Sequence, residues 1–201
     1  MKERSLTIAV DCDDVLVPTA RDAVEYYNTT YGTNVDLTHF YGGTPEDWFV
    51  DDIATASRRI EEYHMTLFEE APAPYPEAII AIKSLARVHK LYLVTGRADF
   101  LRPVTKIMAD THFLDCFQGV IHTSYFTETG RSKGEVCREI GAHALIDDGL
   151  MHCESAVIEG GVESALLLDQ PWNQCESLHS RIIRCMDWDA VLREVDNIAR
   201  C

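Results

Sequence analysis

Short apolar runs alternate with helix-like stretches over most of the chain, and this alternation limits the possible folds more than any other feature. The first run, residues 6–10, is rich in β-forming residues and stops directly at the acidic Asp11. Such a run is typical of a buried parallel strand that carries polar side chains at its carboxyl end. Similar runs follow at residues 91–94, 120–121, 144–146, 164–168 and 181–185.

Helix-like stretches separate most of these runs, and a last one follows them. They lie at residues 77–89, 100–109, 133–140, 151–159 and 190–199. A regular succession of strand and helix is the pattern of an α/β protein in which helices connect parallel strands. The sequence therefore predicts a doubly wound parallel sheet with helices on both faces.

One segment interrupts this succession, because it contains two helix-like stretches, 19–31 and 45–70, and no convincing strand. It ends in a proline-rich stretch that breaks the helical pattern and favours a new helix at Pro76. A chain of 201 residues has room for one sizeable core and a small additional unit. We therefore expect a small helical cap after the first strand, with core residues 1–17 and 74–201 and cap residues 18–73.

The composition disfavours some partners and locations. No segment approaches the roughly 18 consecutive apolar residues of a membrane span, and the run at 6–10 is too short for a signal peptide. We therefore expect a cytoplasmic protein that does not bind membranes. The formal net charge is −15 and Lys and Arg form no cluster, which argues against binding to nucleic acid.

Cysteine and histidine show no metal-binding pattern. The seven cysteines are scattered without a C-x-x-C pair, and the eight histidines have no H-x-H or H-x-x-x-H spacing. We expect reduced thiols and no histidine metal site, so any bound metal would have oxygen ligands.

Polar residues follow three of the predicted strands directly. They are D-C-D-D-V at 11–15, T-G-R at 95–97 and D-D-G at 147–149, and Lys133 opens the helix that leads to the last of these strands. Ligands bind at the carboxyl ends of the strands in an open parallel sheet. We therefore expect all four segments to meet at one edge of the sheet.

Taken in order, these four segments resemble the four motifs of the haloacid dehalogenase superfamily, over residues 6–148. The resemblance implies a phosphatase in which Asp11 is the nucleophile and forms an aspartyl-phosphate. Asp13 would protonate the leaving oxygen and then accept a proton from the attacking water. A dehalogenase needs no such acid, so Asp13 favours hydrolysis of phosphate esters.

A hard dication with oxygen ligands, Mg²⁺, is expected at this edge. The ligands would be Asp11, the main-chain carbonyl of Asp13, and Asp147, with Asp148 bound through water or placed behind the ligands. The acidic pair at 147–148 is thus assigned to the metal.

The remaining motif residues are expected to bind the phosphoryl group. Thr95 and the amide of Gly96 can donate hydrogen bonds to its oxygens, and Lys133 can neutralise them. Arg97 has two interpretations, contact with the substrate or pairing with surface acids. Asp14 stands where many members of the superfamily have glycine, and it could alter the turn into the cap.

The function then depends on the cap. A small helical cap and a D-x-D-x-V opening resemble the deoxyribonucleotidase branch, which favours nucleoside or deoxynucleoside monophosphates as substrates. A phosphosugar phosphatase or phosphomutase is the alternative, and a non-catalytic phosphate-binding module is a third. The loop 39–49 carries aromatic residues on which a base could stack, and the candidates are Phe40, Trp48 and Phe49.

Overall fold

A computed structural model of the chain describes residues 4–124, 130–175 and 177–200. Its centre is a six-stranded sheet in which the strands are ordered β3-β2-β1-β4-β5-β6 and neighbouring strands are parallel. The strands are β1 (Thr7–Val10), β2 (Lys90–Thr95), β3 (Phe117–His122), β4 (Ala144–Asp147), β5 (Ser164–Leu168) and β6 (Ile182–Cys185). The predicted α/β class and parallel sheet are confirmed.

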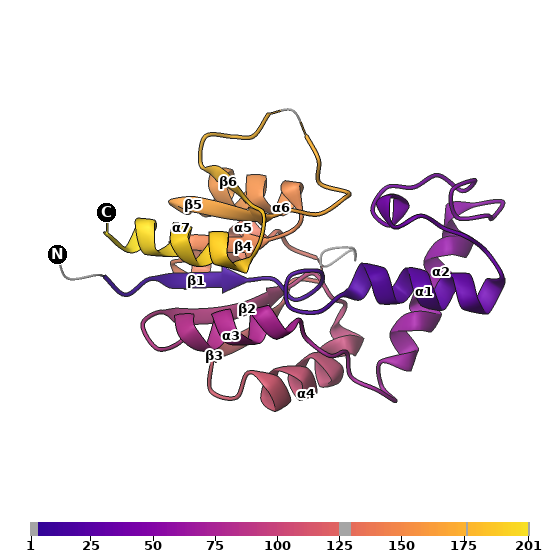
Figure 1. The fold of residues 1–201 in the computed structure, drawn as a ribbon, viewed down its shortest axis with the longest axis horizontal. Helices are drawn as coiled ribbons and strands as arrows, with labels where there is room; N and C mark the ends of the chain where they lie inside the picture. Colours follow the sequence, from indigo (N-terminus) through magenta and orange to yellow (C-terminus); the bar gives the residue numbers. More distant parts are fainter. Residues whose placement is uncertain (1–3, 125–129, 176, 201) are drawn as a thin grey trace.

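Helices cover both faces of this sheet (Figure 1). They are α3 (Pro76–Leu85), α4 (Arg102–His112), α5 (Lys133–Ile140), α6 (Leu150–Ser155) and α7 (Trp188–Arg200), with the short 3-10 helix η2 (Asp99–Leu101) and the π-helical segment η3 (Ala156–Gly160). Two hydrophobic clusters result. Ile8 and Val10 of β1 belong to the cluster with α3, α4 and α7, whereas Ala9 belongs to the cluster with α5 and α6. This alternation follows from the two-residue period of a strand and makes the sheet doubly wound.

The central position of β1 explains its uniformly apolar sequence. Ile8, Ala9 and Val10 are fully buried, since helices lie over both faces and strands flank both edges. Val10 is in register with Leu93 of β2 and with Ile146 of β4. The residues that follow these three strands therefore emerge side by side at one edge of the sheet.

The segment after β1 forms helices beyond this edge, at the end of the molecule opposite the two termini (Figure 1). They are α1 (Thr19–Tyr31), the turn η1 (Leu37–His39) and α2 (Ile53–Thr66). They share a small hydrophobic cluster that includes Val24, Tyr27 and Trp48. The division into core and cap at residues 18 and 73 stays a prediction, and we use the word cap for the helices α1 and α2 and the loop between them.

The second cap helix is shorter than the predicted stretch of residues 45–70. Its N-cap is Asp52, whose side chain accepts a hydrogen bond from the Thr55 amide at 2.8 Å. An aspartate in this position satisfies a free amide of the first turn and so fixes where the helix begins. Residues 45–52 form turns instead, with Phe49 at a φ of 54°.

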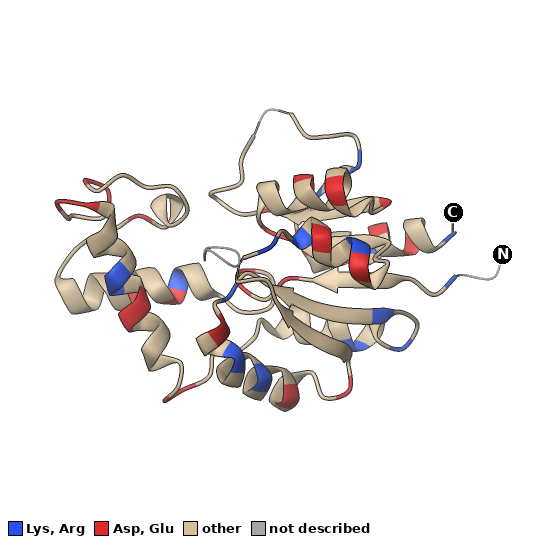
Figure 2. Cartoon of the chain, turned by 180° about the vertical axis from the view of Figure 1, so that it is seen from behind, with Lys and Arg blue, Asp and Glu red and all other residues tan. Residues whose placement is uncertain are grey.

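The charged side chains are distributed over the whole molecule. Figure 2 shows Lys and Arg spread along both the core and the cap, with Asp and Glu between them. Among the described residues, no helix combines the length and apolar character needed to cross a membrane. The cysteines that the structure describes are all free, as expected, while Cys201 lies outside the described residues.

Candidate active site

Lys133 lies between two carboxylates at the carboxyl edge of the sheet. It is the first residue of α5, where Ser132 and Glu135 form a capping box that fixes the start of the helix. Its Nζ lies 2.6 Å from Oδ1 of Asp11 and 2.7 Å from Oδ2 of Asp147. Burial alone would lower the pKa of Lys133, but the two carboxylates raise it, so the ammonium stays charged.

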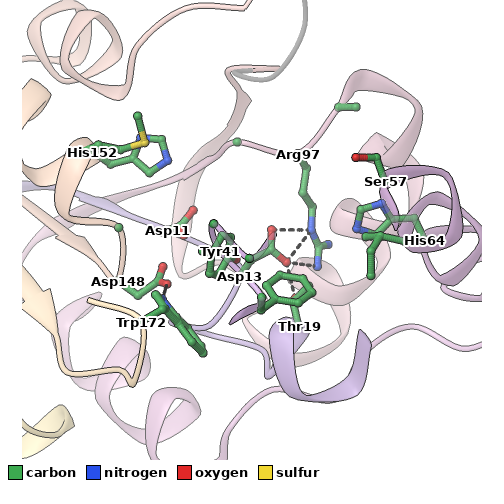
Figure 3. Close-up of a pocket in the computed structure, with 18 of the residues that line it drawn as sticks. Asp11, Asp13, Thr19, Tyr41, Ser57, His64, Arg97, Asp148, His152 and Trp172 are labelled. Atoms are coloured by element: carbon green, nitrogen blue, oxygen red, sulfur yellow. Dashed lines mark hydrogen bonds and ion pairs between the residues drawn. The ribbon is translucent and has the colours of Figure 1, made fainter. Parts of the chain in front are cut away.

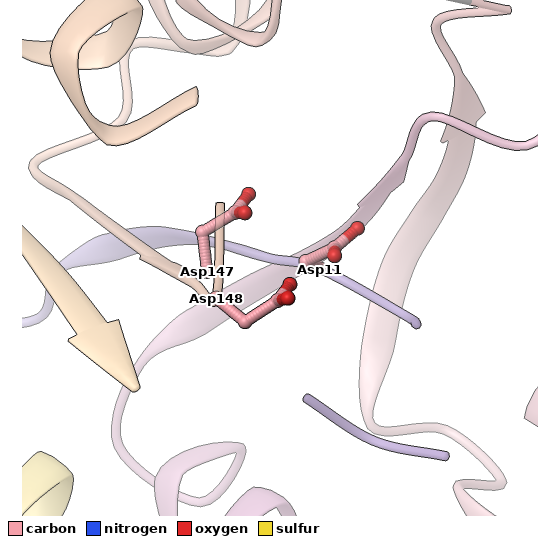
Figure 4. A group of neighbouring side chains, drawn as sticks. All are labelled: Asp11, Asp147 and Asp148. Carbon is pink, nitrogen blue, oxygen red and sulfur yellow. The ribbon is translucent and has the colours of Figure 1, made fainter. Parts of the chain in front are cut away.

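Asp11, Asp147 and Asp148 form a buried acidic cluster (Figure 4). Each offers an oxygen within 4.8 Å of the other two. Burial raises the pKa of Asp11 to about 7, although Lys133 opposes the shift. Burial, followed by the neighbouring Asp147 and Asp11, raises the pKa of Asp148 well above its ordinary value.

The charge of this cluster fits a divalent cation. With all three carboxylates ionised and only the Lys133 ammonium between them, the site carries three negative charges and one positive charge, an excess of two. A hard dication binds carboxylate oxygens and would balance this excess. The side chain of Asp13 does not belong to the cluster, so only its main-chain carbonyl remains as the predicted ligand.

Asp13 points toward Arg97 and the first turn of α1 (Figure 3). Arg97 donates from Nη2 to Oδ1 at 2.7 Å and from Nε to Oδ2 at 3.0 Å, and the Thr19 hydroxyl also donates to Oδ1. Burial opposes ionisation of Asp13, but these partners prevail and lower the pKa of its carboxyl. Asp13 is thus an ionised carboxylate whose two oxygens both accept hydrogen bonds.

Arg97 is therefore neither a surface residue nor a free substrate contact in this conformation. Its side chain is only 4% exposed, and Nη1 also lies 3.2 Å from the Thr105 hydroxyl of α4. The expectation that Arg97 pairs with surface acids is wrong, because its acidic partner is Asp13, whose side chain is only 19% exposed. Arg97 does line the cavity described below, as does Gly96.

Thr95 ends β2 and is completely buried. Its Oγ1 accepts a hydrogen bond from the Arg97 amide at 3.2 Å, which shapes the turn that follows the strand. The predicted hydrogen bond from Thr95 to a phosphoryl oxygen stays a prediction.

The structure shows how Asp14 occupies a position where many members of the superfamily have glycine. Its φ of 58° lies in the left-handed region, which glycine adopts without strain and aspartate tolerates better than most residues. Its carboxyl accepts hydrogen bonds from the Ala20 amide at 2.9 Å and from the Tyr41 hydroxyl at 3.0 Å. Asp14 thus holds the start of α1 and the cap loop, and burial raises its pKa to about 8.

A cavity of about 760 Å³ lies between the sheet edge and the cap. Asp11, Asp13, Lys133 and Asp148 line it from the sheet edge, which we call its floor. Most of the side chains on the cap side are apolar or aromatic, and the polar ones are Thr19, Ser57, Glu61 and His64. The cap residues that line it include Phe40, Tyr41, Trp48, Ile53, Ala56, Ser57, Ile60, Glu61 and His64.

The three predicted aromatic residues lie in different surroundings. Phe40 lines the cavity and is partly buried. Trp48 also borders the cavity, but it is only 4% exposed and packs against Tyr27 in the cap. Phe49 is 57% exposed and lines a separate depression on the cap, so its predicted contact with a substrate in this cavity is wrong.

Sequence reasoning missed Trp172 and Tyr41. Trp172 follows β5, and its Nε1 donates to Oδ2 of Asp148 at 2.8 Å. Its ring contacts that of Tyr41 with 5.2 Å between the centroids. The rule that ligands bind at strand ends applies to β5 as well and would have drawn attention to the segment that contains Trp172.

No family model matches the sequence, and no curated protein sequence matches it. Solved structures do match its fold. A haloacid dehalogenase-like hydrolase of Streptococcus pneumoniae is similar at 18% identity with a TM-score of 0.67, over 95% of this chain and 98% of that chain. The chain has the haloacid dehalogenase-like fold.

Two further structures share this fold. A protein of Haemophilus somnus described as a predicted phosphoglycolate phosphatase matches at 16% identity with a TM-score of 0.65, over 97% of this chain and 99% of that chain. The HAD-hydrolase YfnB of Bacillus subtilis, in a structure bound to magnesium, matches at 12% identity with a TM-score of 0.65, over 96% of this chain and 99% of that chain. Similarity at this level of identity concerns the fold alone and does not favour the deoxyribonucleotidase branch.

Proposed function

We propose that this protein is a cytoplasmic, Mg²⁺-dependent phosphatase that hydrolyses phosphate monoesters through an aspartyl-phosphate on Asp11. The observation that carries the proposal is the buried cluster of Asp11, Asp147 and Asp148 around Lys133, at the floor of a cavity between sheet and cap. The names of the structures with the same fold support it, since they include a predicted phosphatase and a hydrolase bound to magnesium.

In the proposed first step, a carboxylate oxygen of Asp11 attacks phosphorus and the bond from phosphorus to the ester oxygen breaks. The leaving oxygen takes a proton from Asp13. In the second step water attacks phosphorus, Asp13 takes a proton from it, and the bond to Asp11 breaks, which releases phosphate. Asp13 is an ionised carboxylate while both of its oxygens accept hydrogen bonds from Arg97 and Thr19. The acid role therefore requires Asp13 to leave these donors, to bind a proton from solvent and to turn toward the substrate before the first step; the proton that it takes from water in the second step restores this form for the next cycle.

The other residues neutralise and orient the phosphoryl group. Bound Mg²⁺ would supply charge compensation for the phosphoryl oxygens, held by Asp11, Asp147, Asp148 and the main-chain carbonyl of Asp13. Lys133 would add a positive charge next to the nucleophile. Thr95 and the amide of Gly96 would donate hydrogen bonds.

For the substrate we propose nucleoside or deoxynucleoside monophosphates. Phe40, Ile53 and Ile60 give the cavity a largely apolar wall. Such a wall suits the planar, uncharged base of a nucleotide better than the many hydroxyls of a phosphosugar. A phosphosugar phosphatase or phosphomutase fits the same floor and remains the alternative. A non-catalytic phosphate-binding module would not need Asp11 and Asp13 together.

A hydrolysis panel with Mg²⁺ tests the proposal. It compares ribonucleoside and deoxynucleoside monophosphates, sugar phosphates and p-nitrophenyl phosphate. Asp11→Asn should reduce turnover of every substrate by several orders of magnitude, because an amide cannot form the aspartyl-phosphate. Asp110→Asn, on the exposed surface of α4, is the matched control. Near-normal turnover in a folded Asp11→Asn protein would contradict the mechanism.

A further inference from the structure

Asp148 receives its hydrogen bonds from the loop that follows β5. Trp172 Nε1 donates to the carboxylate oxygen Oδ2 at 2.8 Å, and Asn173 Nδ2 donates to the main-chain carbonyl at 2.9 Å. Figure 3 shows the indole of Trp172 beside the carboxylate of Asp148. Asp148 has no ion pair with Lys or Arg among the described residues, whereas Asp11 and Asp147 both contact Lys133. The hydrogen bond to its carboxylate therefore comes from a neutral donor, the indole N–H of Trp172.

The loop that carries Trp172 is held firmly to the core. The Asn173 side chain also donates to the Leu168 carbonyl at 2.7 Å. Arg184 of β6 donates to Oδ1 of Asn173 at 2.7 Å and forms an ion pair with Asp169 at 2.7 Å. These contacts hold residues 169 and 173, on either side of Trp172, to β5 and β6, so the indole has a defined position.

Tyr41 restrains the ring of Trp172 from the cap side. The two rings are tilted by 58° with their centroids 5.2 Å apart, and the Tyr41 hydroxyl donates to Asp14 at 3.0 Å. Both rings border the cavity. The indole is thus held between the loop of the core and the loop of the cap, with its N–H directed at Asp148.

We infer that Trp172 is a positioning residue, which orients the carboxylate of Asp148 as a ligand of the metal ion. The inference rests on the metal site proposed above. Groups that hydrogen-bond to a metal-binding carboxylate fix its orientation, and their loss typically weakens metal binding about 10- to 100-fold. Since Trp172 directs its donor at Oδ2, Oδ1 receives no hydrogen bond from the indole and would be available to a metal ion.

Metal binding itself is the test. Mn²⁺ binding is followed by the loss of the free-ion EPR signal, and Mg²⁺ is then used to displace it. Trp172→Phe, which keeps a ring and removes the N–H donor, should weaken Mn²⁺ binding about 10- to 100-fold. Trp172→His keeps a ring N–H and should recover part of the affinity.

Trp188→Phe is the matched control. Trp188 is buried in the core at the start of α7, and its Nε1 has no hydrogen-bond partner among the described residues. Removing this N–H should leave Mn²⁺ affinity unchanged. Equal affinity in Trp172→Phe and the wild type would overturn the role of Trp172 while leaving the metal site in place. A wild-type protein that binds neither ion would overturn both the metal site and this role.

Discussion

Asp13 and Arg97 form a two-pronged ion pair, in which Arg97 Nη2 lies 2.7 Å from Oδ1 and Nε lies 3.0 Å from Oδ2 of Asp13. The pair lies at the junction of core and cap. Arg97 is anchored to Thr105 in α4, and the Thr19 hydroxyl at the start of α1 also donates to Asp13. The residue proposed as general acid is therefore part of a buried network that joins the two helices to the sheet edge.

Removing the arginine should destabilise the protein strongly. Arg97→Gln leaves the largely buried carboxylate of Asp13 without its ionic partner, and breaking a buried pair in this way costs about 3–5 kcal/mol. Urea unfolding measures the change. The exposed pair of Arg102 and Asp99 offers the control, because Arg102→Gln should have a much smaller effect. If Asp13→Asn and Arg97→Gln proved additive in the double variant, the two residues would not be coupled.

The acid role of Asp13 predicts a dependence on the leaving group. Asp13→Asn should slow hydrolysis of alkyl phosphates roughly 100- to 10,000-fold, since an alkoxide needs a proton to leave. p-Nitrophenyl phosphate should lose much less, because p-nitrophenolate leaves without protonation. Turnover numbers for both substrates decide the point, and equal losses on the two would argue that Asp13 has a structural role only.

Metal removal should abolish activity. EDTA is expected to stop hydrolysis, Mg²⁺ to restore it, and Ca²⁺ to inhibit, because its looser coordination misplaces Asp11. Mg²⁺ at about 100 times its dissociation constant should also stabilise the folded state by about 2.7 kcal/mol, visible as a higher melting temperature. Activity that survives exhaustive chelation would remove the metal from the mechanism.

The sequence predicted the fold and the floor of the site for one physical reason. The carboxyl ends of parallel strands share an edge, so the residues at the ends of β1 and β4, and Lys133 at the start of the helix before β4, had to meet there. Asp11, Asp147 and Asp148 do lie together. This argument needs only the order of the elements and not the rotamer of any side chain.

What the sequence did not predict depends on side-chain direction. Asp13 and Arg97 are 84 positions apart, and nothing in their spacing indicates that they pair. Phe49 was expected to face the substrate, but it lies in a turn with a left-handed backbone, is 57% exposed and lines a separate depression. Trp172 lies four residues beyond Leu168, the last residue of β5, so the strand-end rule covers its segment. Its hydrogen bond to Asp148 depends on the path of the loop, which the sequence does not reveal.

Trp48 was expected to stack on a nucleobase, but it is buried in the cap. Its substitution should therefore affect the stability of the protein. Its ring contacts Tyr27 with 5.0 Å between centroids, and the Tyr27 hydroxyl donates to the Trp48 carbonyl at 2.8 Å. Trp48→Ala should therefore lower the free energy of unfolding by about 3–5 kcal/mol and slow all substrates alike. A rise in KM for nucleotides alone, with an unchanged melting temperature, would show that Trp48 contacts the nucleobase of the substrate.

Phe40 and Phe49 then provide a matched pair for the nucleotide proposal. Both lie in the loop 39–49. Only Phe40 lines the cavity, whereas Phe49 is 57% exposed and lines a separate depression on the cap. Stacking of a base on an aromatic ring contributes about 1–3 kcal/mol, so Phe40→Ala should raise KM for nucleoside monophosphates roughly 5- to 150-fold. A small alkyl phosphate, which has no ring to stack, should keep its KM. Phe49→Ala should change neither value. Steady-state kinetics on these variants test the stacking role, and an equal rise in KM for both phosphates in Phe40→Ala would mean that Phe40 supports the cap and does not bind the base.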